Sequence, residues 1–111
     1  MNFETHQNDG VAVVDVIGTL DVATATELTD YLGTLLKRFP KKVILNLEGV
    51  GYMASSGLAM LVSSLKKSKE MRVPFAICGM SPAVLNEVKT TGLGDILPIY
   101  QDVKEAEKAL D

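Results

Sequence analysis

Residues 43–67 read VILNLEGVGYMASSGLAMLVSSLKK, a stretch that contains the signals of a strand, a loop and a helix. Its first five residues, Val43–Leu47, are apolar except for Asn46, as expected of a central strand covered on at least one face. From Leu58 the apolar residues recur three and four positions apart, which is typical of a helix with one buried face. Glu48–Gly57 is the predicted connecting loop. A strand followed by an amphipathic helix is the building unit of an α/β fold.

Upstream of this unit the sequence predicts two strands and a helix. Val11–Ile17 is rich in β-branched residues and apolar except for Asp15, which favours a strand. The turn residues before it make residues 2–7 the other arm of a hairpin. Thr24 and Glu27 have the spacing of a capping box, so we expect a helix to begin there and to end before Pro40.

Downstream, each predicted element carries its own start or stop signal. Ser81 and Pro82 supply the N-cap and the first-position proline of a third helix, and Gly92 its C-terminal stop. The other predicted elements are strands at 75–78 and 96–100 and a helix from a second capping-box pair, Asp102 and Glu105, to Leu110. This order predicts one α/β domain over residues 1–111, with a mostly parallel sheet of about five strands and about four helices.

Composition and charge narrow the possible functions. The chain has 111 residues, of which 47% are hydrophobic and 23% charged, with a net charge of −3 and no basic stripe. We therefore expect neither nucleic-acid binding nor, without about 18 consecutive apolar residues, membrane insertion. Cys78 stands alone in an apolar run and is expected in the core. The polar start of the chain predicts a cytoplasmic protein, and its oligomeric state stays open.

No enzyme signature is present in the sequence. Ser55 and Ser56 lack the flanking glycines of a nucleophile elbow, and Gly49 and Gly51 do not belong to a phosphate-binding loop. His6 is the only histidine, so a triad or a multi-histidine zinc site would depend on it alone. We predict no catalytic, cofactor-binding or metal-binding residue.

The serines at the start of the second helix admit two interpretations. Serine is a preferred N-cap and glycine tolerates a tight turn, so Ser55-Ser56-Gly57 could simply start the helix. The functional interpretation is that a helix N-terminus, with free N–H groups and a positive dipole end, stabilises a phosphate. A phosphate on a serine there would add charge and bulk to an exposed surface without breaking the fold.

Three segments resemble the STAS domains of bacterial anti-sigma factor antagonists. Residues 47–58, LEGVGYMASSGL, resemble the family signature, and GTLD at 18–21 with TATEL at 24–28 is similar to its first loop and helix entry. CGMSP at 78–82, continuing to the Thr91-Gly92-Leu93 turn, is similar to its fourth strand and third helix. The segments cover nearly the whole chain in the family's order. The resemblance implies a STAS-type single domain.

The resemblance also implies partner switching in transcription regulation. The unphosphorylated protein would bind an anti-sigma factor that is also a serine kinase and so release a sigma factor. Phosphorylation by that kinase would end the complex. The family's acceptor serine falls on Ser55, and the implied docking surface consists of Asp21 together with Met53, Ala54, Ser55, Ser56, Gly57 and Leu58.

The chain departs from the family pattern at Ala54, where the family has an acidic residue. This departure keeps a second hypothesis open, a constitutive STAS scaffold in a transport or signalling complex without a phosphorylation cycle. It also makes the loop more apolar. We expect Tyr52 to pack beneath the loop and Met53 to contribute to an adaptable binding patch.

Overall fold

The computed structural model describes residues 2–110, so the first and last residues of the predicted domain, Met1 and Asp111, lie outside the described residues. The elements are, in order, β1 (Asn2–Asn8), β2 (Val11–Leu20), α1 (Val22–Leu36), β3 (Lys42–Met53), α2 (Ser55–Glu70), β4 (Phe75–Cys78), α3 (Pro82–Thr90), the 3-10 turn η1 (Leu93–Asp95), β5 (Ile99–Tyr100) and α4 (Val103–Ala109). The predicted α/β class is confirmed.

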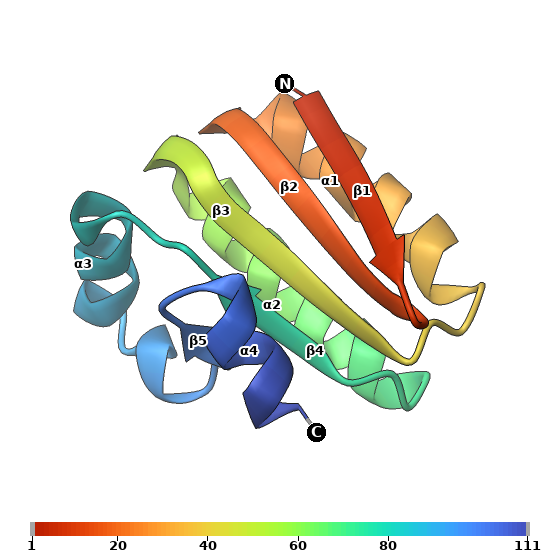
Figure 1. The fold of residues 1–111 in the computed structure, drawn as a ribbon. Coiled ribbons are helices and arrows are strands. Elements are labelled where there is room, and N and C mark those ends of the chain that lie inside the picture. Colours follow the sequence, from red (N-terminus) through yellow and green to blue (C-terminus); the bar gives the residue numbers. More distant parts are fainter. Residues whose placement is uncertain (1, 111) are drawn as a thin grey trace.

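The five strands lie in chain order across one sheet, β1-β2-β3-β4-β5. The β1–β2 pair is antiparallel, and β2 to β5 are parallel to one another. Figure 1 shows α1 and α2 behind the sheet and α4 in front of it. Because the loops after parallel strands all leave from one edge, the entries to α1, α2 and α3 lie at the same edge of the sheet.

Alternate residues along the strands supply two separate cores. Leu45 and Leu47 belong to the main core with residues of α1, α2 and α3. Ile44 lies in a second, smaller core with Ala76 and with Ala106 of α4. This alternation is the period of two expected of a sheet covered on both faces. α3 therefore packs on the main core at one face of the sheet, and α4 packs on the second core at the opposite face.

β3 is longer than the sequence pattern indicates, and the prediction of a loop over Glu48–Gly57 is wrong. Opposite Asp15–Ile17 of β2, the longer segment Asn46–Gly49 of β3 forms a bulge, and a second register shift follows. Bulges let a strand continue pairing while they interrupt its alternation of apolar and polar residues. The Asn46 side-chain oxygen accepts the Glu48 N–H at 3.1 Å at the bulge.

α1 begins three residues before the predicted capping box. Its N-cap is Asp21, whose Oδ1 accepts the Thr24 N–H at 3.1 Å, while the Asp21 N–H donates to Thr24 Oγ1 at 2.8 Å. The predicted box of Thr24 with Glu27 is therefore wrong, because Thr24 is the third helical residue and not the cap. A Thr at this position closes the box as Glu or Gln usually does.

The C-terminal half follows the prediction closely. β4 has the predicted bounds, and Ser81 caps α3 by accepting the Val84 N–H at 3.3 Å. Gly92 adopts a left-handed conformation with φ 79°, which explains why the helix stops before it. The last strand is shorter than the predicted 96–100, because the N–H groups of Ile96 and Leu97 donate to the Leu93 carbonyl of the preceding turn and Pro98 has no N–H.

Candidate partner-binding site

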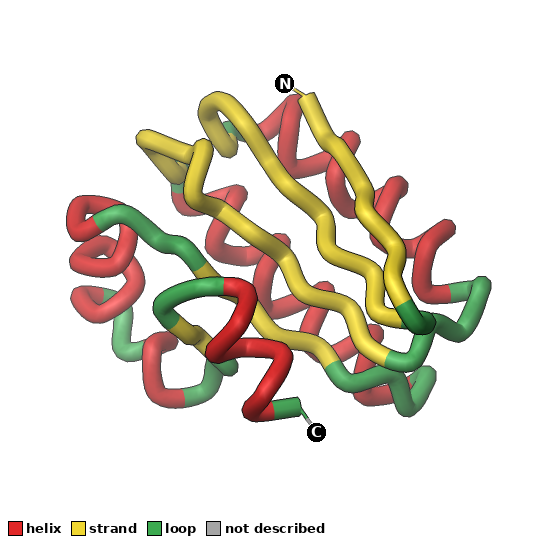
Figure 2. Tube along the Cα trace, in the orientation of Figure 1, coloured by secondary structure: helices red, strands yellow, loops and turns green. Residues whose placement is uncertain are grey.

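Ser55 is the first residue of α2 and is exposed to solvent. Only Ala54 separates it from the end of β3. The Ala54 N–H donates to the Leu20 carbonyl at the end of β2 over 2.9 Å, which ties the two strand ends together. Figure 2 shows β2 and β3 ending at the same edge of the sheet. Ser55 lies at this edge.

α2 begins without a side-chain cap. Ala54 holds the N-cap position in an extended conformation, so Ser55 is not the cap that serine preferences suggest. The Ala54 carbonyl accepts the N–H groups of Gly57 and Leu58 at 2.9 and 3.2 Å. Within residues 2–110, no protein acceptor binds the N–H of Ser55 or Ser56. These open donors and the positive end of the helix dipole favour an anion at this point.

Gly57 is required by a close approach and not by an unusual backbone angle. A Cβ at this position would lie 2.8 Å from Met53 Cγ and 3.0 Å from the Leu20 carbonyl oxygen. Gly57 is not among the residues with a positive φ, so the expectation that its freedom serves a tight turn is wrong. The missing side chain lets the first turn of α2 pack against the ends of β2 and β3, which positions Ser55.

Asp21 lies at the same edge as Ser55. It directly follows Leu20, whose pairing partner Met53 directly precedes Ala54. Hydrogen bonds from the backbone and side chain of Thr24 lower the pKa of Asp21, because they stabilise the carboxylate. Asp21 is therefore a fixed negative charge beside the start of α2.

Several residues expected on the docking surface are buried instead. Met53 is 5% exposed and Leu58 is 7% exposed, and both belong to the main core. Gly57 is buried as well. The expectation that Met53 forms an adaptable surface patch is wrong, because β3 continues to this residue and turns its side chain inward. Gly57 and Leu58 lie beneath the exposed residues and contribute to the packing under them.

Two residues next to these strand ends expose apolar side chains, and the sequence predicted neither of them as exposed. Val22 is 70% exposed and Tyr52 is 59% exposed, so the prediction that Tyr52 packs beneath the loop is wrong. Tyr52 pairs with Thr19 in the sheet, two residues before Asp21. Val22 would have been found if the helix start had been set correctly, since it directly follows the N-cap.

We call Asp21, Val22, Tyr52, Ala54 and Ser55, which lie at or next to the ends of β2 and β3, the docking edge. It combines one fixed carboxylate, two exposed apolar side chains, a half-buried alanine and an exposed hydroxyl. Exposed apolar side chains near a carboxylate and a hydroxyl have the mixed composition of a protein-binding surface.

Ser56 differs from Ser55 although they are neighbours. The Ser56 hydroxyl oxygen is buried and has no hydrogen-bond partner among the described residues. Ser56 lines a hollow between α1 and α2 that also includes Val22 and Met60. Of the two serines, only Ser55 is freely accessible to another protein.

The rest of the described chain offers little other chemistry. Residues 2–110 contain no group of three or more His, Cys, Asp or Glu side chains placed to hold a metal ion. His6 is exposed and binds Asp15, with 2.9 Å between Nε2 and Oδ2. None of the helices described is both long and apolar enough to cross a bilayer.

Fold and site together are those of a small α/β domain that presents an exposed serine at the start of a helix. The STAS domain model matches residues 2–106, and the chain belongs to the STAS family. A Staphylococcus aureus protein named anti-sigma-B factor antagonist is 33% identical over 101 residues, which are 91% of this chain and 94% of that relative.

Solved structures agree on the fold. The crystal structure of an anti-sigma factor antagonist from Mycobacterium paratuberculosis has a TM-score of 0.87 and 29% identity, over 98% of this chain and 92% of that one. A sulfate transporter family protein from Wolinella succinogenes has a TM-score of 0.80 at 17% identity, over 93% of this chain and 86% of that one. The second likeness concerns the fold alone.

Proposed function

We propose that this protein is an anti-sigma factor antagonist whose binding is switched by phosphorylation of Ser55. The observation that carries the proposal is that Ser55, the first residue of α2, is exposed and lies, like Asp21, next to the paired ends of β2 and β3. Relatives that match nearly the full length of the chain carry the name anti-sigma-B factor antagonist. The proposed partner is an anti-sigma factor with serine kinase activity, and the proposed place of action is the cytoplasm.

In the unphosphorylated state the docking edge binds the anti-sigma factor. Val22 and Tyr52 supply apolar area to the contact, and Asp21 supplies a charge whose geometry α1 holds fixed. Fixed polar groups cost less conformational entropy on binding than mobile ones. When this protein binds the anti-sigma factor, the sigma factor that was bound to the anti-sigma factor is released.

Phosphorylation reverses binding without unfolding the domain. A phosphate carries nearly two negative charges at neutral pH. The open N–H groups at the start of α2 and the helix dipole stabilise that charge within the domain. The same phosphate adds negative charge and bulk next to Asp21, so an interface that accommodates the serine hydroxyl no longer closes.

Ala54 affects how the serine is presented. An acidic N-cap would occupy N–H groups in the first turn of α2 and would place a second carboxylate beside the acceptor. With alanine these donors stay open. We propose that the chain retains the switch, and that the missing carboxylate tunes recognition by the kinase.

Incubation with a candidate kinase from the same genome and ATP tests the proposal. We expect intact-mass measurement to find one added phosphate on the wild type and on Ser56→Ala, because the Ser56 hydroxyl is buried. Ser55→Ala should gain none. Phosphate that persists on Ser55→Ala would contradict the assignment. A comparison of Ala54→Asp with the wild type measures how the family's carboxylate changes the rate of phosphorylation.

The second candidate is a constitutive scaffold of a transport or signalling complex. Ala54 at the N-cap of α2 favours it, because a subunit that is never phosphorylated does not need the acidic residue before the serine. The two candidates differ in the kinase experiment. A scaffold would gain no phosphate with any kinase that binds it, and Ser55→Asp, which should weaken the complex of a switch, would leave the complex of a scaffold intact.

A further inference from the structure

A cavity of about 580 Å³ lies at the carboxyl ends of β4 and β5 and shares no lining residue with the docking edge. The chain leaves β4 into α3, which packs on the main core, but it leaves β5 into α4, which packs on the second core across the sheet. In parallel sheets a crevice forms where consecutive connections go to opposite faces, and ligands bind there. Its volume is in the range of about 300–1,000 Å³ that is common for small-molecule sites.

The floor of this cavity is apolar. Met80, Leu85, Ile99 and Tyr100 line it, and each is only partly buried by the protein itself. Met80 and Ile99 pack against the main core, whereas Tyr100 packs against the second. The floor therefore joins both cores and leaves apolar surface available to a ligand.

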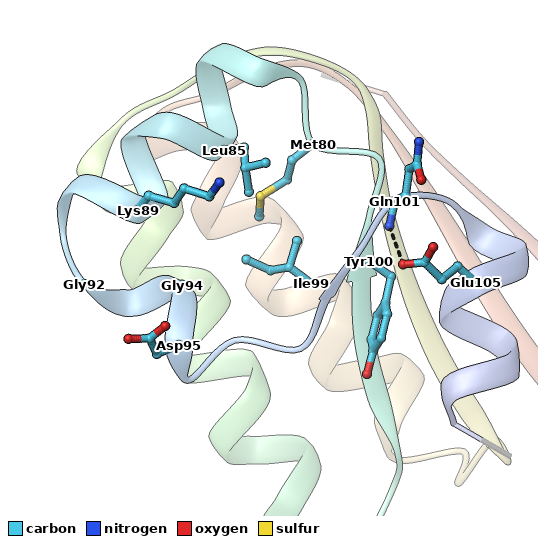
Figure 3. A pocket seen from close by; sticks show the side chains of 10 residues that line it. All are labelled: Met80, Leu85, Lys89, Gly92, Gly94, Asp95, Ile99, Tyr100, Gln101 and Glu105. Atoms are coloured by element: carbon cyan, nitrogen blue, oxygen red, sulfur yellow. Dashed lines mark hydrogen bonds between the residues drawn. The ribbon is translucent and has the colours of Figure 1, made fainter.

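One cation faces this floor. Figure 3 shows the Lys89 side chain extending from α3 toward Met80 and Leu85, while Asp95 points away from them. The Glu105 carboxylate lines the cavity from α4, where its Oε1 accepts the Gln101 N–H at 3.2 Å, and its negative charge favours placing an anionic group on the α3 side, at Lys89. Lys89 is the one positively charged residue in the described lining. An anionic head group beside Lys89 with an apolar body on the floor matches this arrangement.

We propose that the cavity between α3 and β5–α4 binds a small amphiphilic monocarboxylate, with its chain on Met80, Leu85 and Ile99 and its carboxylate at Lys89. The lining leaves no second cation to pair a second negative charge. A compact apolar acid therefore fits the chemistry of the lining better than a phosphorylated nucleotide.

Octanoate, octanol and octylamine serve as matched probes in amide NMR titrations of the full chain, all below their micelle-forming concentrations. We expect octanoate to shift the amides of Gly92, Gly94 and Gln101 and to bind more tightly than octanol, with octylamine weakest. Lys89→Met should weaken octanoate about fivefold and leave octanol unchanged. Lys104→Met, on α4 outside the cavity, is the matched control and should change neither.

Leu85→Trp should block all three probes by filling the cavity. Since Lys89 is exposed, Lys89→Met is expected to fold and the test does not depend on the tryptophan variant. The proposal is overturned if octanoate shifts amides elsewhere but not around the cavity, if octylamine binds as tightly as octanoate, or if Lys89→Met binds octanoate like the wild type.

Discussion

At Gly57 the backbone of α2 approaches the ends of β2 and β3 so closely that no side chain fits between them. The nearest atoms to an added Cβ are a core side-chain carbon of Met53 and the backbone oxygen of Leu20. The backbone oxygen cannot move without disturbing the pairing of β2 with β3. The position of Ser55 therefore depends on a residue that no partner touches.

Gly57→Ala should lower the free energy of unfolding by about 1–3 kcal/mol, the usual cost of overpacking, although alanine favours helix formation. Urea unfolding measures this change. Gly33→Ala in α1 is the matched control, because its added Cβ would meet no atom within 4 Å. We expect Gly33→Ala to stabilise the protein by about 0.5–1 kcal/mol. Equal effects of the two substitutions would contradict the close-approach explanation.

Single residues could be placed from the sequence where a local rule determined them, as at the ends of α3. Ser81, Pro82 and Gly92 follow capping rules and were placed correctly. Met53 and Tyr52 were not, because the bulges in β3 interrupt the alternation by which a strand reveals its buried side. Bulges depend on pairing with a neighbouring strand, which the local sequence does not report.

At the scale of elements, α2 begins with an uncapped first turn. α1, α3 and α4 each have a side-chain cap, from Asp21, Ser81 and Asp102. α2 alone among the described α-helices has none. An uncapped helix start costs stability, and at this position it leaves donors open beside Ser55.

Ala54→Asp should raise the free energy of unfolding by about 1 kcal/mol, because the new carboxylate can accept an open N–H of the first turn. The measurement is urea unfolding at neutral pH. Ala59→Asp, which adds the same charge to an exposed position further along α2, should not stabilise the protein and should cost up to about 0.7 kcal/mol, because Asp favours a helix interior less than Ala. If both variants respond alike, the charge and not the cap is responsible.

Element types and their order could be predicted from hydrophobic spacing and from turn residues, but two boundaries could not. α1 starts at Val22, because Asp21 and Thr24 form its capping box. Thr24 and Glu27 have the same spacing, so spacing alone did not identify the correct pair. β3 continues through residues that read as a loop, because β2 pairs with them. The first error left the exposed Val22 unrecognised, and the second let the buried Met53 be expected on the surface.

At the scale of the whole molecule, the second core contains a buried thiol. Burial raises the pKa of Cys78 to about 12, and the negative charges of Asp102, Asp15 and Glu48 add to the shift. In the unfolded chain the thiol ionises near its ordinary value of 9.0. Between these values the unfolded state has lost a proton that the folded state retains, so rising pH favours unfolding.

The contribution of Cys78 to stability should therefore be complete below about pH 9 and should decline as the pH rises toward about 12. Urea unfolding of wild type and Cys78→Ala at about pH 7 and about pH 10 isolates this effect from other titrating groups. We expect the stability advantage of the wild type to be smaller at the higher pH. An advantage that is constant or grows with pH would contradict the raised pKa.

The central claim is that a charge at Ser55 decides whether a partner binds the docking edge, and a calorimetric titration tests it most directly. The anti-sigma factor that binds the wild type is titrated with Ser55→Asp and with Thr34→Asp, which adds the same charge at an exposed position near the far end of α1. We predict that Ser55→Asp weakens binding at least about tenfold and that Thr34→Asp binds like the wild type. Wild-type affinity for Ser55→Asp would contradict the account.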